Sequence, residues 1–450
     1  MSLLPPTENA FLTEGSRSGE LYEEATRYLP GGNTRTTVFA PPHPLYAARG
    51  QGCWIFDVDG QARLDFVNNY TSLILGHANA AVVDAVTEQL TQGTAFGFPT
   101  EWEIKLAREI ANRVASVEQV RFTNSGTEGV MMAIKAARAF TGRAKIAKFE
   151  GCYHGAYDPV EASQNIDADS PADLANLPTL EYCAGTPRSV LDDVIILPYN
   201  RPDEMERRLR REGDQVAAVI VDLLPNRAGL MPARREFVER LRAVTREIGA
   251  LLIVDEVLVF RVAYGGSQAL FGAEPDLSAF GKIIGGGFPV GAVGGRADVM
   301  AVFDPRRQGG SVPHGGTFNA NPITVVAGLA TLAQLPPSEF ERLAALGDDL
   351  RFGLRQRFVQ LGVRWQITGA GSLFRIHPHA RPLIDYRSSL ATPDELQAMS
   401  AFYERMLANG IVISPQGLGC LSTPMGAIEI QAFVDAAEKS LHEVKAAGLL

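Results

Sequence analysis

The chain has 450 residues, a formal net charge of −9, and a composition that is 46% hydrophobic and 21% charged. Such a composition is typical of a globular protein with a large apolar core. The acidic balance, which no basic tract offsets, argues against a nucleic-acid partner. No apolar run reaches the roughly 18 residues that a membrane span needs. Four separated cysteines and an N-terminus without a signal-peptide pattern predict a reduced, cytoplasmic protein.

Residues 1–75 are expected to form an N-terminal segment that packs with a smaller, C-terminal domain. Two β-rich runs flank Asp59 and Gly60, and an Asp-Gly pair between such runs is a strong hairpin signal. The segment is therefore predicted to contribute a β-hairpin.

Residues 76–325 alternate between strand-like and helix-like stretches, which predicts a large α/β domain. Within it, one helical face carries Phe237, Leu241, Val244 and Ile248, and Gly249 follows as a C-cap. The strands on either side of this helix are continuous apolar runs, as expected when helices cover both faces of a parallel sheet.

The character of the sequence changes after residue 325. Helix-like stretches over about 337–361, 393–409 and 427–446 alternate with short strand-like runs, which predicts a smaller α+β domain over residues 326–450. Residues 156–190, rich in Asp, Ser, Pro and Ala, are expected to form a long irregular loop, and loops of this length often act as lids.

Three polar features follow predicted strands of the large domain, where open α/β sheets bind ligands. The first is "TNSGTE", residues 123–128, whose free N–H groups and small hydroxyls at a helix start suit a phosphate. The same residues could equally serve as an ordinary helix cap.

Asp255 and Lys282 supply the other two features. A carboxylate that leaves a buried strand needs a partner, either in a structural salt bridge or on the ring nitrogen of a ligand. A dehydrated lysine can form an imine with an aldehyde, although a surface lysine is the simpler interpretation of Lys282 alone. Taken together, the three features match pyridoxal 5′-phosphate. Lys282 would hold it as an internal aldimine while Asp255 keeps its ring nitrogen protonated.

The chain also carries, in this order, the stretches "TNSGTE", "YHGAYD", "LLIVDEVLVFRVAYGG", "DLSAFGKIIGGGFPVGAVGGRADVM" and "GTFNANPI". From about residue 28 to the C-terminal helix it resembles the class III pyridoxal-phosphate aminotransferases, in the branch of glutamate-1-semialdehyde aminomutase and the β-amino-acid (β-phenylalanine) transaminases. The resemblance implies fold type I: a large domain with a mainly parallel seven-stranded sheet, a small domain, and a homodimer with shared active sites.

The resemblance also implies roles for the residues that match its motifs. The phosphate would be bound by Ser125, Gly126 and Thr127, and the ring would lie between Tyr153 and Val257. Thr317 would reach the phosphate of the partner subunit. Without the resemblance, Tyr153 would be interpreted as a core aromatic, Val257 as strand filler and Thr317 as a turn residue.

Four residues are expected to bind substrate: Arg35, Tyr70, Arg227 and Gln416. Arg35 matches an arginine that binds the substrate carboxylate in the β-amino-acid branch, and the short "DEVLVFR" resembles that branch too. Arg35 could also form a surface salt bridge.

Two stretches depart from the family pattern. Asp222-Leu223 stands where the family has Glu-Pro, and nearby Arg227 either clamps a second carboxylate or points to solvent. Gln416 replaces an arginine that receives the α-carboxylate of 2-oxoglutarate in the β-amino-acid branch, and a glutamine cannot offer the same charged fork. No metal site is predicted, because the spacing of His77, His154 and His314 is not that of metal ligands.

The leading hypothesis is a transaminase that moves an amino group from an amino acid, in particular a β-amino acid such as an aromatic one, to a keto acid. The alternative is a glutamate-1-semialdehyde 2,1-aminomutase, which needs no external acceptor. A third hypothesis is a non-catalytic protein that binds pyridoxal phosphate, and intact Lys282 and Asp255 argue against it.

Overall fold

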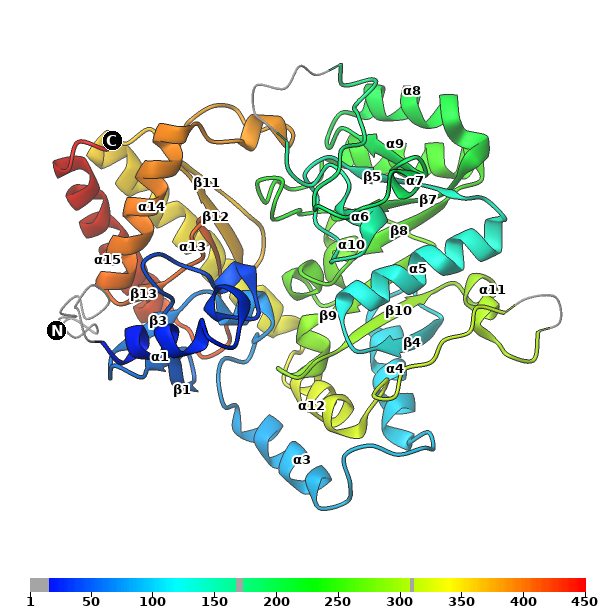
Figure 1. Ribbon diagram of the computed structural model, residues 1–450, viewed down its shortest axis with the longest axis horizontal. Helices are drawn as coiled ribbons and strands as arrows, with labels where there is room; N and C mark the ends of the chain where they lie inside the picture. The colour runs from blue at the N-terminus through cyan, green and yellow to red at the C-terminus, as the bar shows by residue number, and fades with distance from the viewer. Residues whose placement is uncertain (1–15, 167–172, 308–310) are drawn as a thin grey trace.

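The computed structural model describes residues 16–166, 173–307 and 311–450, which form three β-sheets. Figure 1 shows the largest sheet with its helices on one side of the molecule, and the N- and C-terminal segments together on the other. None of the helices in these ranges is both long enough and apolar enough to cross a bilayer.

The largest sheet has seven strands in the order β4-β10-β9-β8-β7-β5-β6. In it β10 runs antiparallel to both of its neighbours, and the other pairs are parallel, so the predicted mainly parallel sheet is confirmed. The carboxyl ends of the remaining strands therefore share one edge. The strands are β4 (Gln119–Thr123), β5 (Lys145–Phe149), β6 (Val194–Leu197), β7 (Val216–Val221), β8 (Leu251–Asp255), β9 (Leu277–Gly281) and β10 (Gly291–Gly295).

Helices cover both faces of this sheet because successive strand residues point to opposite sides. In β7, Ala218 and Ile220 pack in one apolar cluster with α5 (Gly126–Thr141), whereas Val219 and Val221 pack with α8 (Pro202–Glu212) and α9 (Arg235–Ile248). A strand buried on both sides needs apolar residues at every position, which explains its uninterrupted "VAAVIV".

The helix termini follow local capping chemistry. α9 ends as predicted at Gly249, which has a left-handed φ of 69°. α5 begins at Gly126 rather than near Glu128, because the Ser125 hydroxyl accepts the Glu128 N–H at 3.2 Å and acts as the N-cap. The further helices are α1 (Arg17–Ala25), α3 (Ala80–Leu90), α4 (Glu101–Arg113), α10 (Gly266–Phe271) and α12 (Pro322–Ala333).

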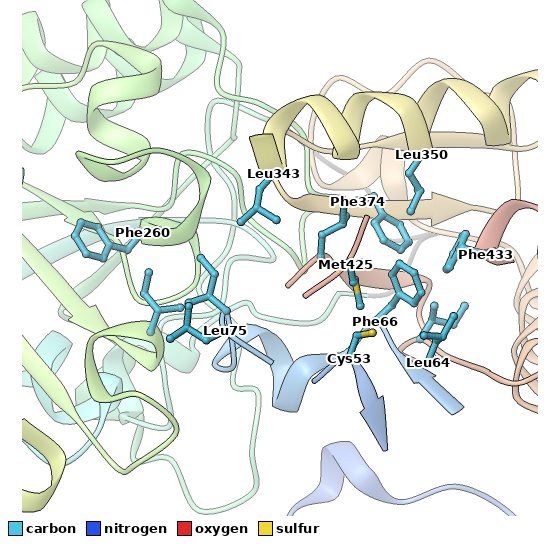
Figure 2. Packing of buried hydrophobic residues seen from close by; sticks show 14 of the residues in the cluster. Cys53, Leu64, Phe66, Leu75, Phe260, Leu343, Leu350, Phe374, Met425 and Phe433 are labelled. Carbon is cyan, nitrogen blue, oxygen red and sulfur yellow. The ribbon is translucent and has the colours of Figure 1, made fainter. Parts of the chain in front are cut away.

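The N-terminal segment packs with the C-terminal part of the chain. The predicted hairpin forms from β2 (Trp54–Asp57) and β3 (Ala62–Asp65), and β3 pairs in parallel with β13 (Ile411–Val412). Phe66, which follows β3, lies 4.6 Å from Phe433 and 6.2 Å from Phe374 between ring centroids (Figure 2). Such aromatic contacts add to the burial of apolar area. The domain boundaries at residues 75 and 325 stay a prediction.

The C-terminal region combines a three-stranded antiparallel sheet with three long helices, as expected for an α+β unit. Its elements are α13 (Pro337–Leu361), β11 (Gln366–Thr368), β12 (Leu373–His377), α14 (Pro393–Ala408), β14 (Leu418–Cys420) and α15 (Ala427–Ala446). Within residues 156–190, two short helices form, α6 (Asp158–Glu161) and α7 (Arg188–Leu191), and residues 167–172 lie outside the described residues.

Candidate active site

Asp255 and Lys282 lie at the carboxyl edge of the seven-stranded sheet. β8 ends at Asp255, and its parallel neighbour β9 ends one residue before Lys282. The loop after β4, which carries Ser125, and the loop after β5, which carries Tyr153, begin at the same edge. The sheet thus gathers at one edge the residues that the sequence marked, although they are spread over more than 150 positions.

Asp255 is buried and held by two neighbours. One carboxylate oxygen, Oδ1, accepts the Val257 N–H at 2.9 Å, and the other, Oδ2, lies 2.7 Å from Nδ1 of His154. Burial lowers the pKa of His154, and the hydrogen bond and charge of Asp255 act in the opposite direction. A neutral imidazole with its hydrogen on Nδ1 donates that hydrogen to the Asp255 carboxylate and so orients it.

Lys282 stands in a left-handed conformation with φ of 50°, which is uncommon for a residue with a side chain. Burial lowers the pKa of its amine, while the charges of Asp255 and Asp222 oppose the shift. A lowered pKa raises the fraction of neutral amine at physiological pH, and the neutral amine is the nucleophile.

Asp222 is a second buried carboxyl at this edge, one residue beyond β7. Burial, with the nearby charge of Asp255, raises its pKa well above the ordinary value. Its Oδ1 accepts the Leu224 N–H at 2.9 Å. The edge therefore carries two carboxyl groups, and burial disfavours the charged form of Asp222.

The loop before α5 has the features of an anion cradle. Because Ser125 satisfies the Glu128 N–H, the N–H groups of Gly126 and Thr127 are left at the helix start without a helical partner. A Cβ on Gly126 would lie 2.6 Å from Cγ1 of Val257, so only glycine fits there. Small hydroxyls beside free N–H groups suit a phosphate.

Tyr153 and Val257 both lie in loops that begin at this edge of the sheet, after β5 and β8. Val257 packs against Gly126 and Gly281. The Tyr153 side chain is 48% exposed, so it is not the core aromatic that would be inferred without the family resemblance. Burial nevertheless raises the pKa of its hydroxyl, with smaller effects from charges that include Asp255.

Thr317 is exposed in a turn that is tied to the cradle. Asn319 joins them: its Oδ1 accepts from Nδ2 of Asn124 at 2.8 Å, and its Nδ2 lies 3.2 Å from Nε2 of His314. His314 in turn accepts from Nε of Arg121 at 2.8 Å. The structure thus places His314 in a hydrogen-bond network.

Arg35 and Tyr70 belong to two segments that contact each other. Nη1 of Arg35 donates to Oδ1 of Asn69 at 2.8 Å, and the Tyr70 hydroxyl donates to the Thr37 carbonyl. The Asn69 amide is neutral, so the surface salt bridge considered for Arg35 is not the contact that forms. Arg35 therefore keeps its charge available for a ligand.

Arg227 and Gln416 differ in their surroundings. Nη2 of Arg227 donates to Oδ1 of Asn165 at 2.6 Å, and its guanidinium lies 5.5 Å from the centroid of the Tyr182 ring. Gln416 is exposed in the turn between β13 and β14. The structure thus anchors Arg227 and leaves Gln416 at the surface.

Two residues with contacts near the candidate active site were not predicted from the sequence to have a part in it. His154 was considered only as a metal ligand, although its place beside Tyr153 in "YHG" was a usable signal. Arg375, on β12, donates from Nη1 to the carbonyl of Asn226, next to Arg227. No local pattern predicts that contact.

The residues at this edge fit pyridoxal 5′-phosphate. At the start of α5 the N–H groups of Gly126 and Thr127 have no helical partner and can donate to a phosphate, and the missing side chain of Gly126 lets Val257 pack closely beside them. Asp255 offers a buried negative charge for a cationic ring nitrogen, and Lys282 offers an amine for an aldehyde.

Comparisons with known proteins agree with this fit. The family model of class III aminotransferases matches residues 38–438. A glutamate-1-semialdehyde 2,1-aminomutase 2 from Geobacillus kaustophilus is 41% identical over 430 residues, which cover 94% of this chain and 97% of the relative.

Three solved structures are also similar. An ω-transaminase from Sphaerobacter thermophilus has 53% identity and a TM-score of 0.95, covering 97% of this chain and all of that one. A transaminase with pyridoxal phosphate bound has 42% identity and a TM-score of 0.90, with coverage of 97% and 99%. A β-phenylalanine aminotransferase from Variovorax paradoxus has 36% identity and a TM-score of 0.86, with coverage of 95% and 94%.

The length of the family match and the geometry of the sheet edge lead to one conclusion. The chain belongs to the class III aminotransferases, and it is an enzyme whose cofactor is pyridoxal 5′-phosphate.

Proposed function

We propose that this enzyme transfers an amino group from an amino acid to a keto acid, with Lys282 as the residue that binds the cofactor and moves the proton. The observation that carries the proposal is the pairing of a lysine of lowered pKa with the buried, His154-held carboxylate of Asp255. The ω-transaminase at 53% identity supports transfer between two molecules.

Each part of the cofactor would meet a different group of residues. Ser125, Gly126 and Thr127 would hold the phosphate, and Asp255 would face the ring nitrogen. Tyr153 and Val257 would flank the ring, and Thr317 would serve the partner subunit's phosphate. When bound, the cofactor supplies an electron sink for the carbon that loses a proton.

The chain's own groups would then manage charge and protons. The amine of Lys282 would move a proton between the substrate Cα and the cofactor carbon on the other side of the substrate nitrogen, for which a pKa near working pH is best. His154 would keep Asp255 oriented. Burial disfavours the charged form of Asp222, which acts on Lys282.

A β-amino-acid donor is the narrower proposal. Arg35 would bind the donor carboxylate as a planar fork, with Tyr70 beside it, and its guanidinium has a neutral partner that a carboxylate could displace. The β-phenylalanine aminotransferase, at 36% identity, supports this donor class.

The second candidate, a glutamate-1-semialdehyde 2,1-aminomutase, is favoured by the curated relatives. Aminomutases from Methanothermobacter thermautotrophicus and Geobacillus kaustophilus are 38% and 41% identical to this chain. Among these comparisons, the curated relatives support an aminomutase more strongly than they support a β-amino-acid donor.

We also propose a homodimer with shared active sites and a cytoplasmic location. Large aromatic side chains are exposed beside Thr317, after the cofactor lysine and between α3 and α4, and a second subunit would cover them: Phe318, Phe288, Phe96 and Phe98. The four cysteines are free, which suits a reducing compartment.

Two assays test the function. Purified enzyme with pyridoxal phosphate is mixed with 3-aminobutyrate or β-phenylalanine and with 2-oxoglutarate or pyruvate, and the new amino acid is measured. Glutamate-1-semialdehyde alone is tested for conversion to 5-aminolevulinate. Product in the first assay alone supports the transaminase, product in the second alone supports the aminomutase, and product in neither contradicts both.

The Lys282→Ala variant tests whether Lys282, rather than another lysine, binds the cofactor. After borohydride reduction, mass spectrometry should find the cofactor on Lys282 of the wild type, whereas the variant should retain none. A cofactor attached to a different lysine would overturn the assignment.

A further inference from the structure

Two neighbouring arginines form no ion pair with any residue of the described ranges. Arg227 follows β7 in the large-sheet region, and Arg375 lies on β12 of the C-terminal sheet. Both guanidinium groups donate to neutral acceptors instead. Two neighbouring cations without a counter-charge are costly in a partly buried position.

Arg375 is held in place but not neutralised. Its Nη1 donates to the carbonyl of Asn226, and its Nε is buried without a hydrogen-bond partner. Burial, with the charge of Arg227 acting in the same direction, lowers the pKa of this guanidinium to about 10. The two positive charges therefore act on each other.

Among the described residues, Arg227 is positioned by neutral groups. Besides Asn165, its neighbours are the Tyr182 hydroxyl, 3.5 Å from Nη1, and the Tyr182 ring. Arg227 lies in the loop that follows β7, five residues after Asp222 at the carboxyl edge of the sheet. Its charge also opposes the rise in the pKa of Tyr153 that burial causes. The loop that carries Arg227 thus begins at the sheet edge that holds the candidate cofactor site.

The nearby carboxyl groups are already engaged. Both oxygens of Glu150 accept from Arg387, at 2.8 and 2.9 Å, and Oε2 of Glu161 accepts from the Cys183 thiol at 3.3 Å. Burial raises the pKa of Asp222 well above its ordinary value, which disfavours its charged form. Since no described carboxylate pairs with Arg227 or Arg375, the carboxylate of a ligand would balance their charge.

The C-terminal sheet brings Arg375 to this loop through a firm contact. The Thr368 hydroxyl donates to the Gly229 carbonyl at 2.7 Å, and Nε2 of His377 lies 3.1 Å from the same oxygen. With the Arg375 bond to Asn226, these contacts anchor both ends of the segment that carries Arg227. A pre-positioned pair of guanidinium groups loses little freedom on binding.

We propose that Arg227 and Arg375 form a subsite for a carboxylate of the amino acceptor, a dicarboxylic 2-oxo acid such as 2-oxoglutarate. The subsite supplies the positive charge that Gln416 does not. Guanidinium groups bind carboxylates through paired, charge-assisted hydrogen bonds. The inference rests on the transaminase function proposed above.

The first test measures binding without chemistry. Glutarate, an unreactive dicarboxylate, is titrated into the holoenzyme by isothermal calorimetry, using wild type, Arg227→Met and Arg375→Met. We expect an affinity loss of about 10- to 100-fold in each variant, the size that a lost hydrogen bond to a charged group gives. Arg235→Met, which removes an exposed guanidinium from α9, should bind as wild type.

The second test uses the reaction. KM for 2-oxoglutarate should rise in both variants, while KM for pyruvate, which has one carboxylate, changes less than about 3-fold. Thermal unfolding shows whether Arg375→Met still folds, and Arg375→Lys is a milder replacement that keeps the positive charge. If Arg375→Met does not fold, Arg227→Met decides the test.

The outcomes are distinguishable. The proposed subsite is wrong if glutarate binding to the wild type cannot be detected. It is also wrong if glutarate binds equally well to wild type and to Arg227→Met. Equal losses for pyruvate and 2-oxoglutarate overturn it too. Absence of amine transfer with intact, arginine-dependent glutarate binding would refute the proposed transaminase and keep the carboxylate subsite.

Discussion

Nδ1 of His154 lies 2.7 Å from Oδ2 of Asp255, although 101 positions separate the two residues along the chain. Both side chains are buried, and the second imidazole nitrogen, Nε2, has no hydrogen-bond partner. The histidine therefore has one firm contact, and that contact is with the carboxylate expected to face the cofactor's ring nitrogen.

Replacing His154 with Ala should lower kcat by about 10- to 100-fold, because Asp255 loses the donor that orients it. KM for the donor should change little, and the pH dependence of the bound cofactor's absorbance should shift. His154→Asn, which offers an N–H near the same place, should restore part of the rate. A spectrum unchanged in His154→Ala would contradict the positioning role, and His442→Ala on the exposed face of α15 serves as the control.

Gly126→Ala should weaken cofactor binding by about 5- to 100-fold, because the new methyl group meets Val257 and must push it or the cradle aside. Absorbance titration of the apoenzyme measures this. Adding Val257→Ala should recover part of the affinity, since it removes the clash. Gly426→Ala, before α15, where the nearest atom lies 3.6 Å from the new Cβ, is the matched control, and a loss of the same size there would refute the steric explanation.

Arg35→Met should raise KM for amino acid donors by about 10- to 100-fold, since a charge-assisted bond to the carboxylate is lost. An amine donor without a carboxylate, such as 1-phenylethylamine, should not be affected. Initial rates over a range of donor concentrations measure both. If the two donors suffer equally, Arg35 holds the fold of residues 35–70 rather than the substrate.

Acid should destabilise the fold through His377. Burial lowers its pKa to about 3, whereas an unfolded histidine titrates near 6.5. Below about pH 6.5 the unfolded chain binds a proton that the folded chain does not, so stability falls as pH falls toward 3, by up to about 1.4 kcal/mol per pH unit. Thermal unfolding at pH 7 and pH 5 measures the loss, which should shrink in His377→Asn. An equal loss in the variant would assign the acid sensitivity to other groups.

Much of the fold was accessible from local patterns. The apolar run of β7 and the single apolar face of α9 predicted a sheet covered on both sides, because these patterns depend only on neighbouring residues. The places of Asp255 and Lys282 followed as well, since parallel strands put their carboxyl ends at one edge. The start of α5 was placed two residues late because the Ser125 cap was interpreted as part of the loop.

The site's fine chemistry could not be predicted in this way. The raised pKa of Asp222 depends on burial among groups far away in the sequence. The contact of Arg375 with Asn226 spans 149 positions and two sheets, so no spacing signals it. Long-range packing sets both the charges and the partners.

The parallel pairing of β3 with β13 has a consequence for biosynthesis. A ribosome that has released the hairpin at Trp54–Asp65 must still add nearly 350 residues before Ile411 emerges to complete that sheet. Until then one edge of β3 stays open, and an open edge can pair with another chain. Nascent chains stalled before Ile411 should therefore need a holding chaperone that the finished enzyme does not.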